Sequence, residues 1–345
     1  MTAREIIVNV SSGRYVVSIG AGVRKQLPEV VAGLSPHRVA IVADQALAKT
    51  HLPVVASLLS GEAHTVTFPG GEEHKTLDSV ARLLEFLAER NFTRSDLVVA
   101  LGGGITGDVA GFAAATYLRG IRVVQMPTTF LSAIDSSVGG KTGVNLPQGK
   151  NLCGAFWQPS AVLCDTDFLQ TLPRRILLDG VAEAVKCGMI RDMALFELLE
   201  KPGALENSLE EVIARCVALK ADVVAGDEFD RGDRALLNFG HTIGHAVEKC
   251  TDFAIPHGQA VAIGMARMTR IAEARGWCEP GCAERLFAVL QHYELPTDIP
   301  CDWQALLAAM AHDKKCSGDT LTIVTPERIG CCVRRTIAFS EWTQL

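Results

Sequence analysis

The sequence has no stretch of about 18 uncharged apolar residues, so it predicts no membrane-spanning helix. Its first residues, MTAREIIVNV, are charged at Arg4 and Glu5 and contain no long apolar segment, so no signal peptide is expected and the predicted location is the cytoplasm. There is also no excess of basic residues. The formal net charge is −6, which argues against a general nucleic-acid binder because phosphate backbones are bound by basic surfaces.

Eleven cysteines are present, yet they lack the spacing of a metal site or of a disulfide framework. Cys278 and Cys282 are four residues apart, and Cys331 and Cys332 are adjacent. A zinc site needs further Cys or His residues at close spacing, and a disulfide framework is not expected in a chain of this length without a secretion signal. We therefore predict that the cysteines are buried or incidental thiols.

What the sequence does contain is the composition of a globular protein, with 345 residues of which 48% are apolar and 21% charged. This length predicts about two domains. In the first half, apolar β-branched runs alternate with helical patterns, which predicts an α/β domain with a mostly parallel, Rossmann-like sheet. The predicted strands are 4–10, 14–19, 38–43, 64–68, 96–101, 121–126 and 161–164.

The pattern changes after Phe168. Helical patterns then follow one another, and only 320–335 has a β pattern. The predicted helices are 173–190, 192–200, 209–226, 234–250, 257–276, 281–295 and 301–314. We therefore predict a second, all-α domain with a small β-hairpin, and domain limits of 1–168 and 169–345. The default position for a ligand is the cleft between two such domains.

A glycine-rich segment after the strand 96–101 has the character of a phosphate-binding loop. Gly102, Gly104 and Gly107 match G-x-G-x-x-G, which lets a pyrophosphate approach the backbone and a helix N-terminus. The acidic residue that ends the next strand of a dinucleotide-binding fold is missing, and Pro127-Thr128-Thr129 stands there instead. The glycines therefore predict a phosphate site, without assuring the standard dinucleotide fold.

A second glycine-rich segment, GGKTG at 139–143, resembles part of a P-loop. Asp135 stands where G-x-x-x-x-G-K-[ST] requires a glycine, and this disfavours a nucleotide triphosphatase. Lys141, Lys150 and Asn151 could together hold a phosphate monoester. Alternatively, they belong to a solvated loop, which is the usual environment of lysine.

Two histidines four residues apart, His241 and His245, project from one face of a predicted helix and could bind a metal. For an isolated pair, one structural and one surface histidine is the more common arrangement. Glu183 and His257 strengthen the metal hypothesis. Glu183 is a charge on an otherwise apolar helix face, and two histidines with a carboxylate are typical of catalytic zinc sites. The spacing leaves open which histidines are ligands.

Three further basic residues have both a functional and an ordinary interpretation. Lys186 lies three residues after Glu183, so the two could form a surface ion pair. Lys220 and Arg234 lie on separate predicted helices and could hold a carboxylate. The sequence alone favours ordinary surface positions for Lys220 and Arg234.

These segments resemble those of the 3-dehydroquinate synthases, a family of the sugar-phosphate cyclase superfamily, over nearly the whole chain. The motifs that carry the resemblance are GGEEHK (70–75), GGGITGDVAGFAAATYLRG (102–120), PTTFLSAIDSSVGGKTGVNLPQGKN (127–151), FLQTLP (168–173), GVAEAVK (180–186), RALLNFGHTIGHAVE (234–248), PHGQAVAIGM (256–265) and HDKK (312–315). Each motif is weak alone, and together they are highly specific.

The resemblance implies a lyase of the shikimate pathway, which leads to chorismate and the aromatic amino acids. Its substrate would be 3-deoxy-D-arabino-heptulosonate 7-phosphate, and its products 3-dehydroquinate and phosphate. The expected course is transient oxidation by NAD, β-elimination of phosphate, re-reduction and an intramolecular aldol closure. The resemblance also implies an NAD-binding first domain, a second domain that binds the metal and the substrate, and a homodimer.

Site residues follow from the same resemblance. A divalent metal, zinc or cobalt, would be held by Glu183, His241 and His257, which leaves His245 as a partner of the substrate phosphate. The residues expected to bind NAD are Asp44, Glu72, Lys75, Gly103, Gly104, Ile105, Asp108, Thr128, Thr129, Asp135, Lys141, Lys150, Phe168, Thr171 and Leu172. Those expected to contact the substrate are Lys141, Asn151, Lys186, Lys220, Arg234, Asn238, His245, Lys314 of HDKK, and Arg119, which would reach the neighbouring subunit's site.

Two positions depart from common family patterns, Ile176 after LPRR and Gln259 after PHG, and neither is an expected ligand. The first alternative is a sibling cyclase such as an aminodehydroquinate synthase, although the expected phosphate and carboxylate contacts are retained. The second is a metal-dependent alcohol or glycerol dehydrogenase, which usually has Asp at the position of Glu183. The third is a non-catalytic binding protein, which is disfavoured because such proteins usually lose a ligand, the clamp or the cofactor loop.

Overall fold

The computed structural model describes residues 3–59, 63–311, 316–317 and 320–342, and its internal contacts divide the chain into two units. Unit 1 is Met1–Pro173 with Lys220–Phe229, and unit 2 is Arg174–Leu219 with Asp230–Leu345. These units differ from the predicted domains in two ways. The first unit continues past residue 168 to Pro173, and it takes in a segment of ten residues, 220–229, from the second half of the chain.

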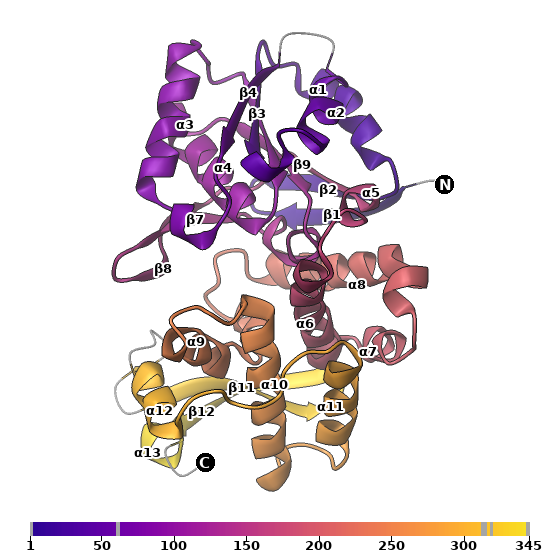
Figure 1. Cartoon of the computed structure of the whole chain (residues 1–345), viewed down its shortest axis with the longest axis vertical. Coiled ribbons are helices and arrows are strands. Elements are labelled where there is room, and N and C mark those ends of the chain that lie inside the picture. The colour runs from indigo at the N-terminus through magenta and orange to yellow at the C-terminus, as the bar shows by residue number, and fades with distance from the viewer. Residues whose placement is uncertain (1–2, 60–62, 312–315, 318–319, 343–345) are drawn as a thin grey trace. The chain divides into compact units, whose positions relative to one another are not determined.

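Unit 1 is built on a seven-stranded sheet with the strand order β1-β2-β9-β6-β5-β3-β4 (Figure 1). In this sheet β1 and β2 pair antiparallel, and the other neighbours run parallel. The prediction of a mostly parallel, Rossmann-like sheet is confirmed. The strands are β1 (Arg4–Val10), β2 (Gly13–Gly20), β3 (Val39–Asp44), β4 (His64–Phe68), β5 (Leu97–Gly102), β6 (Arg122–Pro127) and β9 (Ala161–Asp165).

Both faces of this sheet are buried, which explains why its central strands are continuous apolar runs. Ala40 and Val42 of β3 pack into one hydrophobic core with helices α3 (Leu77–Glu89) and α4 (Gly104–Thr116). The alternate residues Ile41 and Ala43 pack into a second core on the opposite face, with α1 (Leu27–Leu34) and α2 (His51–Ala56). Figure 1 shows the two helix pairs on either side of the sheet.

A β-hairpin of β7 (Lys141–Leu146) and β8 (Gly149–Phe156) follows β6 and was not predicted. Its sequence is rich in glycine and polar residues, a composition that favours a loop. The two strands approach closely at Gly154, where a Cβ would lie 2.1 Å from the Thr142 carbonyl oxygen. Short helices complete unit 1: η1 (Val23–Gln26), η2 (Gln45–Leu47), η3 (Glu72–His74), η4 (Tyr117–Arg119), the π-helix η5 (Ser132–Ser136) and α5 (Thr166–Leu169).

Unit 2 is mainly helical and carries a small sheet of β10 (Cys316–Ser317), β11 (Thr320–Arg328) and β12 (Cys331–Ala338). This confirms the predicted helical second domain with a β-hairpin. Its helices are α6 (Arg174–Arg191), α7 (Met193–Leu199), the first part of α8 (Ala204–Gly226), η6 (Asp233–Asn238), α9 (His241–Cys250), α10 (His257–Ala274), α11 (Cys282–His292), α12 (Trp303–Ala311) and α13 (Phe339–Trp342). Among the helices of the described residues, none has the combination of length and hydropathy that a membrane span requires.

The predicted helix 234–250 is wrong as a single element. The structure instead has the 3₁₀ helix η6 followed by α9, with a break at Phe239 and Gly240. Gly240 has a φ of 78°, in the left-handed region that glycine adopts readily, and a Cβ there would lie 2.8 Å from the Val261 carbonyl oxygen. The break places His241 at the first position of α9.

Two glycines allow α10 to approach its neighbours closely. A Cβ on Gly264 would lie 1.9 Å from the Gly240 carbonyl oxygen, and a Cβ on Gly258 would lie 1.9 Å from the Asp179 carbonyl oxygen. A residue with a side chain could not fit against either backbone. This packing brings the first turns of α9 and α10 together with the middle of α6, which is where the predicted metal ligands lie.

Candidate metal centre and candidate cofactor site

Three predicted ligands of unit 2 converge although they come from three helices. Glu183 lies in the middle of α6, His241 begins α9 and His257 begins α10. Glu183 Oε1 is 3.4 Å from His241 Nε2 and 3.5 Å from His257 Nε2. One potential ligand atom from each residue lies within 4.8 Å of the other two. The structure therefore brings together the three residues whose association the sequence spacing left open.

These distances suit a divalent metal ion. Two ligand atoms of a tetrahedral zinc site, each about 2.1 Å from the ion, are roughly 3.4 Å apart. The spacings from Glu183 Oε1 to the two histidine nitrogens match this value. Glu183 is 2% exposed, its Oε2 pairs with the Lys186 ammonium and its Oε1 faces the two histidine nitrogens. Because buried carboxylates are normally hydrogen-bonded or metal-bound, the group fits a metal site.

The His241 ring is held in the orientation that metal binding requires. Its Nδ1 is 3.1 Å from the Phe239 carbonyl oxygen, so Nδ1–H can donate there while the Nε2 lone pair faces Glu183. Burial, together with the nearby Lys186 ammonium, lowers the pKa of His241 well below its ordinary value. The ring is therefore neutral at physiological pH, which is the form that binds metals.

His257 lies between two carboxylates. Its Nε2 faces Glu183, and its Nδ1 is 3.5 Å from Glu248 Oε1 on α9. Burial alone would lower the pKa of His257, but the Glu183 and Glu248 carboxylates raise it to about 10 in the metal-free protein. A metal at Nε2 must therefore displace a proton from this ring.

Glu183 and Lys186 form an ion pair in the interior of unit 2. Each is 2% exposed, so the alternative of a surface ion pair is wrong. Burial by itself raises the pKa of Glu183, but the Lys186 ammonium and the two histidines hold it well below its usual range. Glu183 is therefore an anion at neutral pH and can act as a charged ligand.

Other predicted residues of unit 2 lie on η6 and α9. The ring centroid of His245, one turn after His241, is 5.4 Å from that of His241 and 6.1 Å from that of His257. Arg234 lies on η6, and Asn238 is the last residue of that helix. Arg234 is 2% exposed, so the surface position that its sequence favoured is wrong. Lys314 lies outside the described residues.

In unit 1, the predicted cofactor residues gather at the carboxyl ends of the parallel strands, where ligands of such sheets bind. Asp44 ends β3, Gly103 caps α4 directly after β5, and Thr128 follows β6. The strand order reverses between β3 and β5, since β4 lies beyond β3 and β6 lies beyond β5. Such a switch point forms a crevice for a ligand.

The start of α4 is suited to an anionic group. A Cβ on Gly103 would lie 3.0 Å from Thr129 Cγ2, so a side chain here would require Thr129 to move by a few tenths of an ångström. Gly104 and Ile105 form the first turn of the helix, whose amides have no intrahelical acceptor. These N–H groups and the helix dipole favour a phosphate at this position.

Charged residues at this edge of the sheet are paired with polar partners. Lys75 Nζ is 2.5 Å from Asp108 Oδ2 and 2.6 Å from Asn151 Oδ1. Glu72 Oε1 accepts a hydrogen bond of 2.7 Å from Asn145 Nδ2. Burial raises the pKa of Asp108, and the Lys75 ammonium opposes that shift. The network links the segment after β4, helix α4 and the β7–β8 hairpin.

Lys220 belongs to this unit because the last part of α8 does. Its Nζ is 2.6 Å from Asp135 Oδ1 on the π-helix η5, and it also donates to the Asp135 carbonyl oxygen. Lys220 is 6% exposed, so the surface position favoured by its sequence is wrong. The structure therefore connects a predicted substrate residue with a predicted cofactor residue.

The remaining predicted residues of unit 1 lie on three separate segments. Phe168 is on α5, and Thr171 and Leu172 follow that helix. His51 Nε2 is 3.0 Å from Thr171 Oγ1, and the His51 ring lies 4.5 Å from that of Phe168. Lys141 begins β7 and Lys150 lies on β8, on strands and not in a loop. Arg119, at the end of η4, is exposed and has a φ of 68°.

Two family models together match most of the chain. The model described as 3-dehydroquinate synthase N-terminal matches residues 65–179, and the model described as 3-dehydroquinate synthase C-terminal matches residues 180–316. This chain belongs to the 3-dehydroquinate synthase family. The family assignment predicted from the motifs is confirmed.

Relatives in the family are similar over nearly their whole length. A 3-dehydroquinate synthase of Streptococcus suis (strain 05ZYH33) is 40% identical over 347 residues, which cover 98% of this chain and 98% of the relative. A protein of Amycolatopsis mediterranei (strain S699), named as a putative aminodehydroquinate synthase, is 46% identical over 312 residues, which cover 90% of this chain and 85% of the relative.

Two solved structures share the fold of this chain over nearly its whole length. A 2-deoxy-scyllo-inosose synthase, complexed with carbaglucose-6-phosphate, NAD+ and Co2+, has a TM-score of 0.89 and 27% identity and covers 99% of this chain and 98% of its own. A 2-epi-5-epi-valiolone synthase from Streptomyces hygroscopicus, with NAD+ and Zn2+ bound, has a TM-score of 0.86 and 28% identity, with coverage of 96% and 94%. The similarity spans both units of the 3-dehydroquinate synthase fold described above.

Sequence reasoning missed two residues that support the predicted ones. Glu248 is 3% exposed and faces His257. The sequence spacing could have indicated Glu248, because it follows His241 by seven residues and so lies two turns later on the same helix face. Asn145, which holds Glu72, had no such signal because the hairpin that carries it was not predicted.

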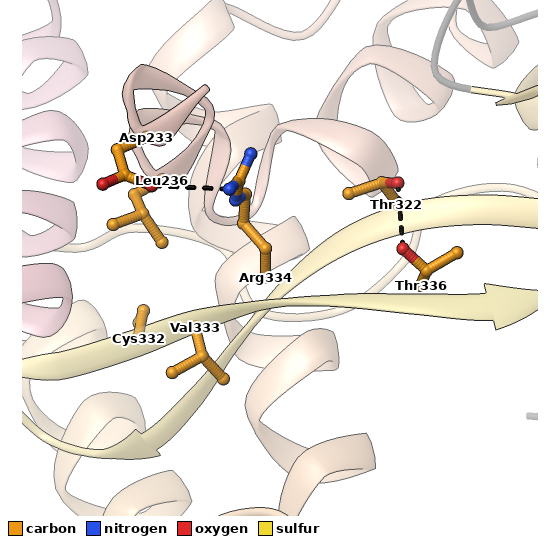
Figure 2. Close-up of a pocket in the computed structure, with 7 residues that line it drawn as sticks. All are labelled: Asp233, Leu236, Thr322, Cys332, Val333, Arg334 and Thr336. Carbon is orange, nitrogen blue, oxygen red and sulfur yellow. Dashed lines mark hydrogen bonds and ion pairs between the residues drawn. The ribbon is translucent and has the colours of Figure 1, made fainter. Parts of the chain in front are cut away.

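Figure 2 shows a pocket in another part of unit 2, between η6 and the β11–β12 hairpin. Arg334 of β12 points to Asp233 of η6, with 3.4 Å between Nη2 and Oδ1. The hydroxyls of Thr322 and Thr336 face each other at 3.4 Å across the hairpin. The seven lining residues include none of the predicted site residues, so this pocket is not the candidate site of the family reaction.

Proposed function

We propose that this protein is a 3-dehydroquinate synthase that converts 3-deoxy-D-arabino-heptulosonate 7-phosphate into 3-dehydroquinate and phosphate. The reaction is redox-neutral overall, because the C5 hydroxyl is oxidised and later restored. The C5 ketone acidifies the C6 proton, so phosphate can leave by β-elimination with the phosphate group itself as the base. Ring opening and an intramolecular aldol then close the carbocycle. This reaction would serve the shikimate pathway.

The observation that carries the proposal is the Glu183, His241 and His257 group, found in a chain that is 40% identical to a 3-dehydroquinate synthase over 98% of its length. Glu183 is buried, the two histidines are partly buried, and the three ligand atoms are spaced for a divalent ion, which would displace the proton on His257. Related cyclases carry Co2+ or Zn2+ together with NAD+. We therefore assign zinc or cobalt to these three residues.

The residues of unit 2 would bind and orient the substrate around this centre. When bound, the ion supplies Lewis-acid polarisation of the C4 and C5 oxygens. Lys186, held beside Glu183, would donate a hydrogen bond to a substrate hydroxyl. His245 and Asn238 would bind the substrate phosphate, together with Lys314, and Arg234 would pair with the substrate carboxylate.

The residues of unit 1 would hold the cofactor and part of the substrate. When bound, NAD supplies a reversible hydride acceptor for C5. Asp44 and Glu72 would accept hydrogen bonds from the nucleoside, while the first turn of α4 would bind the pyrophosphate through its amides. Lys141 and Asn151 on the hairpin would contact the substrate phosphate. Lys220, which is hydrogen-bonded to Asp135 in this structure, would contact the substrate carboxylate. In a homodimer, Arg119 would reach the neighbouring subunit's site.

One assay tests the proposal. Purified protein with NAD and the heptulosonate phosphate should release inorganic phosphate in a single chelator-sensitive reaction, and NADH absorbance should not accumulate. Phosphate release without net NADH is the expected result. Net NADH formation would identify a dehydrogenase instead, and the absence of phosphate release with this substrate would contradict the proposal.

A second candidate function is that of an aminodehydroquinate synthase. It is favoured by one observation, the 46% identity to the Amycolatopsis mediterranei protein. The two substrates differ by an amino group in place of a hydroxyl, and both retain the carboxylate and the phosphate. Competition between the two substrates in one reaction distinguishes them, because the ratio of kcat/KM values reports the preferred transition state. A ratio in favour of the amino substrate would replace the first proposal.

A further inference from the structure

Glu248 is a buried carboxylate with a defined neighbour in the candidate metal centre. It lies in the last turns of α9 and is 3% exposed. Its Oε1 is 3.5 Å from Nδ1 of His257, the ring nitrogen that faces away from Glu183. An ionised carboxylate is costly to bury unless a charged or hydrogen-bonding partner compensates it. The His257 ring provides such a partner.

Helix geometry explains how Glu248 reaches this position. His241, His245 and Glu248 follow one another at spacings of four and three residues, so all three project from one face of α9. Helix α9 packs against α10, and Glu248 and His241 of this face both lie next to His257, the first residue of α10. One helix face therefore carries both a candidate ligand, His241, and the residue that contacts the second ligand.

The two histidines are consequently oriented by different groups. The Phe239 carbonyl oxygen accepts from His241 Nδ1, while a carboxylate faces Nδ1 of His257. A carboxylate partner fixes the ring orientation and makes the opposite nitrogen a stronger electron donor. The His257 side chain is also less restrained by packing, because it is 32% exposed against 12% for His241.

We propose that Glu248 is a positioning residue for the metal centre: it accepts a hydrogen bond from His257 Nδ1–H and so aims Nε2 at the ion. This inference rests on the ligand set in the proposed function, and it goes beyond that set by assigning a role to a residue outside it. Glu248 does not touch the ion or the substrate in this role. Its effect is on metal affinity and on the geometry of the ligand ring.

A second arrangement of the same residues is less favourable. His245, Glu248 and His257 also have potential ligand atoms within 4.8 Å of one another, so a cation could in principle lie among them. His257 would have to use Nδ1 for that cation while Nε2 serves the Glu183 centre, and its ring would then have lost both protons. A hydrogen bond from Nδ1–H to Glu248 needs no such deprotonation.

The test compares Glu248→Ala and Glu248→Gln with the wild-type protein. Alanine removes the acceptor, whereas glutamine keeps the side-chain volume and an amide oxygen that can still accept from Nδ1–H. The matched control is Glu273→Ala on the same helix as His257. Glu273 accepts from the Ala283 amide at 2.8 Å, roughly 24 Å further along α10 by helical rise, and it makes no contact with the metal group.

Zinc affinity is measured on each folded protein by competition with a chromogenic chelator, and the Co2+-substituted proteins are compared by visible absorption. We expect Glu248→Ala to weaken zinc binding by about 10–100-fold and to shift the cobalt bands. Glu248→Gln should fall between Glu248→Ala and the wild type, and Glu273→Ala should bind zinc as the wild type does. A purely structural role would lower thermal stability without changing these two readouts.

Several results would overturn the inference. Zinc affinities of Glu248→Ala and Glu248→Gln within about twofold of the wild type would contradict the role of Glu248. If the alanine variant does not fold, the zinc affinity of the glutamine variant alone decides. Two zinc ions per wild-type chain, with the second lost on substitution of Glu248, would identify the alternative cation site. A wild-type protein without a zinc site would refute the ligand set itself. Tight zinc binding that depends on Glu248 in a protein that releases no phosphate would refute only the proposed reaction.

Discussion

The charged side chains of the two candidate sites have different kinds of partner. In unit 1, charged residues already have polar partners: Lys75 pairs with Asp108, and Lys220 pairs with Asp135. In unit 2, the Glu183 carboxylate pairs with the Lys186 ammonium through its Oε2. Its Oε1 points instead to two histidine nitrogens.

This difference reflects the ligands that each site suits. A nucleotide is bound through many weak contacts. Backbone amides at a helix N-terminus and nearby paired side chains can make these contacts. A metal ion needs a few lone pairs that converge on one point, and a ligand that carries a proton must release it when the ion binds. Unit 1 therefore suits a ligand bound through backbone amides and paired side chains, and unit 2 suits an ion bound by three converging side chains.

The largest expected effect comes from removing a donor in unit 2. Replacing His257 with Ala should lower turnover by roughly 10³-fold or more, because several kcal/mol of Lewis-acid assistance is lost with the ion. Metal content should fall in parallel, while NAD binding should persist because its residues lie in unit 1. His292→Ala, at an exposed histidine of unit 2, is the control. Unchanged activity of the His257 variant would contradict the assignment of a metal site to unit 2.

A smaller effect is expected when a charge pair in unit 1 is broken. Asp108→Asn leaves the Lys75 ammonium, which is 5% exposed, without its carboxylate. We expect a loss of about 3 kcal/mol in the free energy of unfolding, the low end for a broken buried pair. Urea unfolding of the metal-free protein measures it, and the double variant with Lys75→Met should recover part of the loss.

A control for this experiment is available on the surface. The Arg174–Glu294 pair is 62% and 66% exposed, so Glu294→Gln should change the free energy of unfolding by less than about 0.5 kcal/mol. Equal losses in Asp108→Asn and Glu294→Gln would mean that the paired charges of unit 1 are not held in a low-dielectric environment.

Zinc affinity should depend on pH because His257 must lose a proton. Its pKa is raised to about 10 in the metal-free protein, against an ordinary value near 6.5. The bound proton therefore stabilises the metal-free fold fully below about pH 6.5, and that contribution is lost as the pH rises through about 10. Between these limits, zinc affinity should rise by about tenfold per pH unit, with one proton released per ion.

Calorimetric titration in two buffers with different protonation enthalpies measures the released proton. Affinities at pH 7 and pH 8 that agree with each other would show that His257 is already neutral without the ion, in which case its two carboxylate neighbours do not act on it as described.

The smallest expected effect is a local change at the start of α4. Gly103→Ala places a methyl group 3.0 Å from Thr129 Cγ2, so Thr129 or the pyrophosphate must move by a few tenths of an ångström. NAD affinity should fall about tenfold, or ~1.4 kcal/mol, while zinc content stays the same. Gly33→Ala, with no atom near the new Cβ, is the matched control. A loss of zinc in Gly103→Ala would contradict the independence of the two sites.

Much of the fold could be predicted because its signals are local. The alternating burial of β3, with Val42 in one core and Ile41 in the other, appears in the sequence as an unbroken apolar run. The β7–β8 hairpin could not be predicted in the same way. Gly154 allows the two strands to approach closely, and this need depends on the position of the partner strand, which the local sequence does not reveal. The break at Gly240 could not be predicted either, because the glycine is needed there for close contact with the backbone of α10.

The sequence by itself determined the order and type of most elements, the family, and the residue types available for chemistry, because each depends on neighbours along the chain. The family resemblance named Glu183, His241 and His257 as ligands, but only the tertiary structure shows that they meet. It alone also shows that Lys220 is buried against Asp135 and that Glu248 faces a ligand histidine. These contacts join residues on different helices. They depend on how closely helices can pack, and here the missing side chains of Gly258 and Gly264 set that distance.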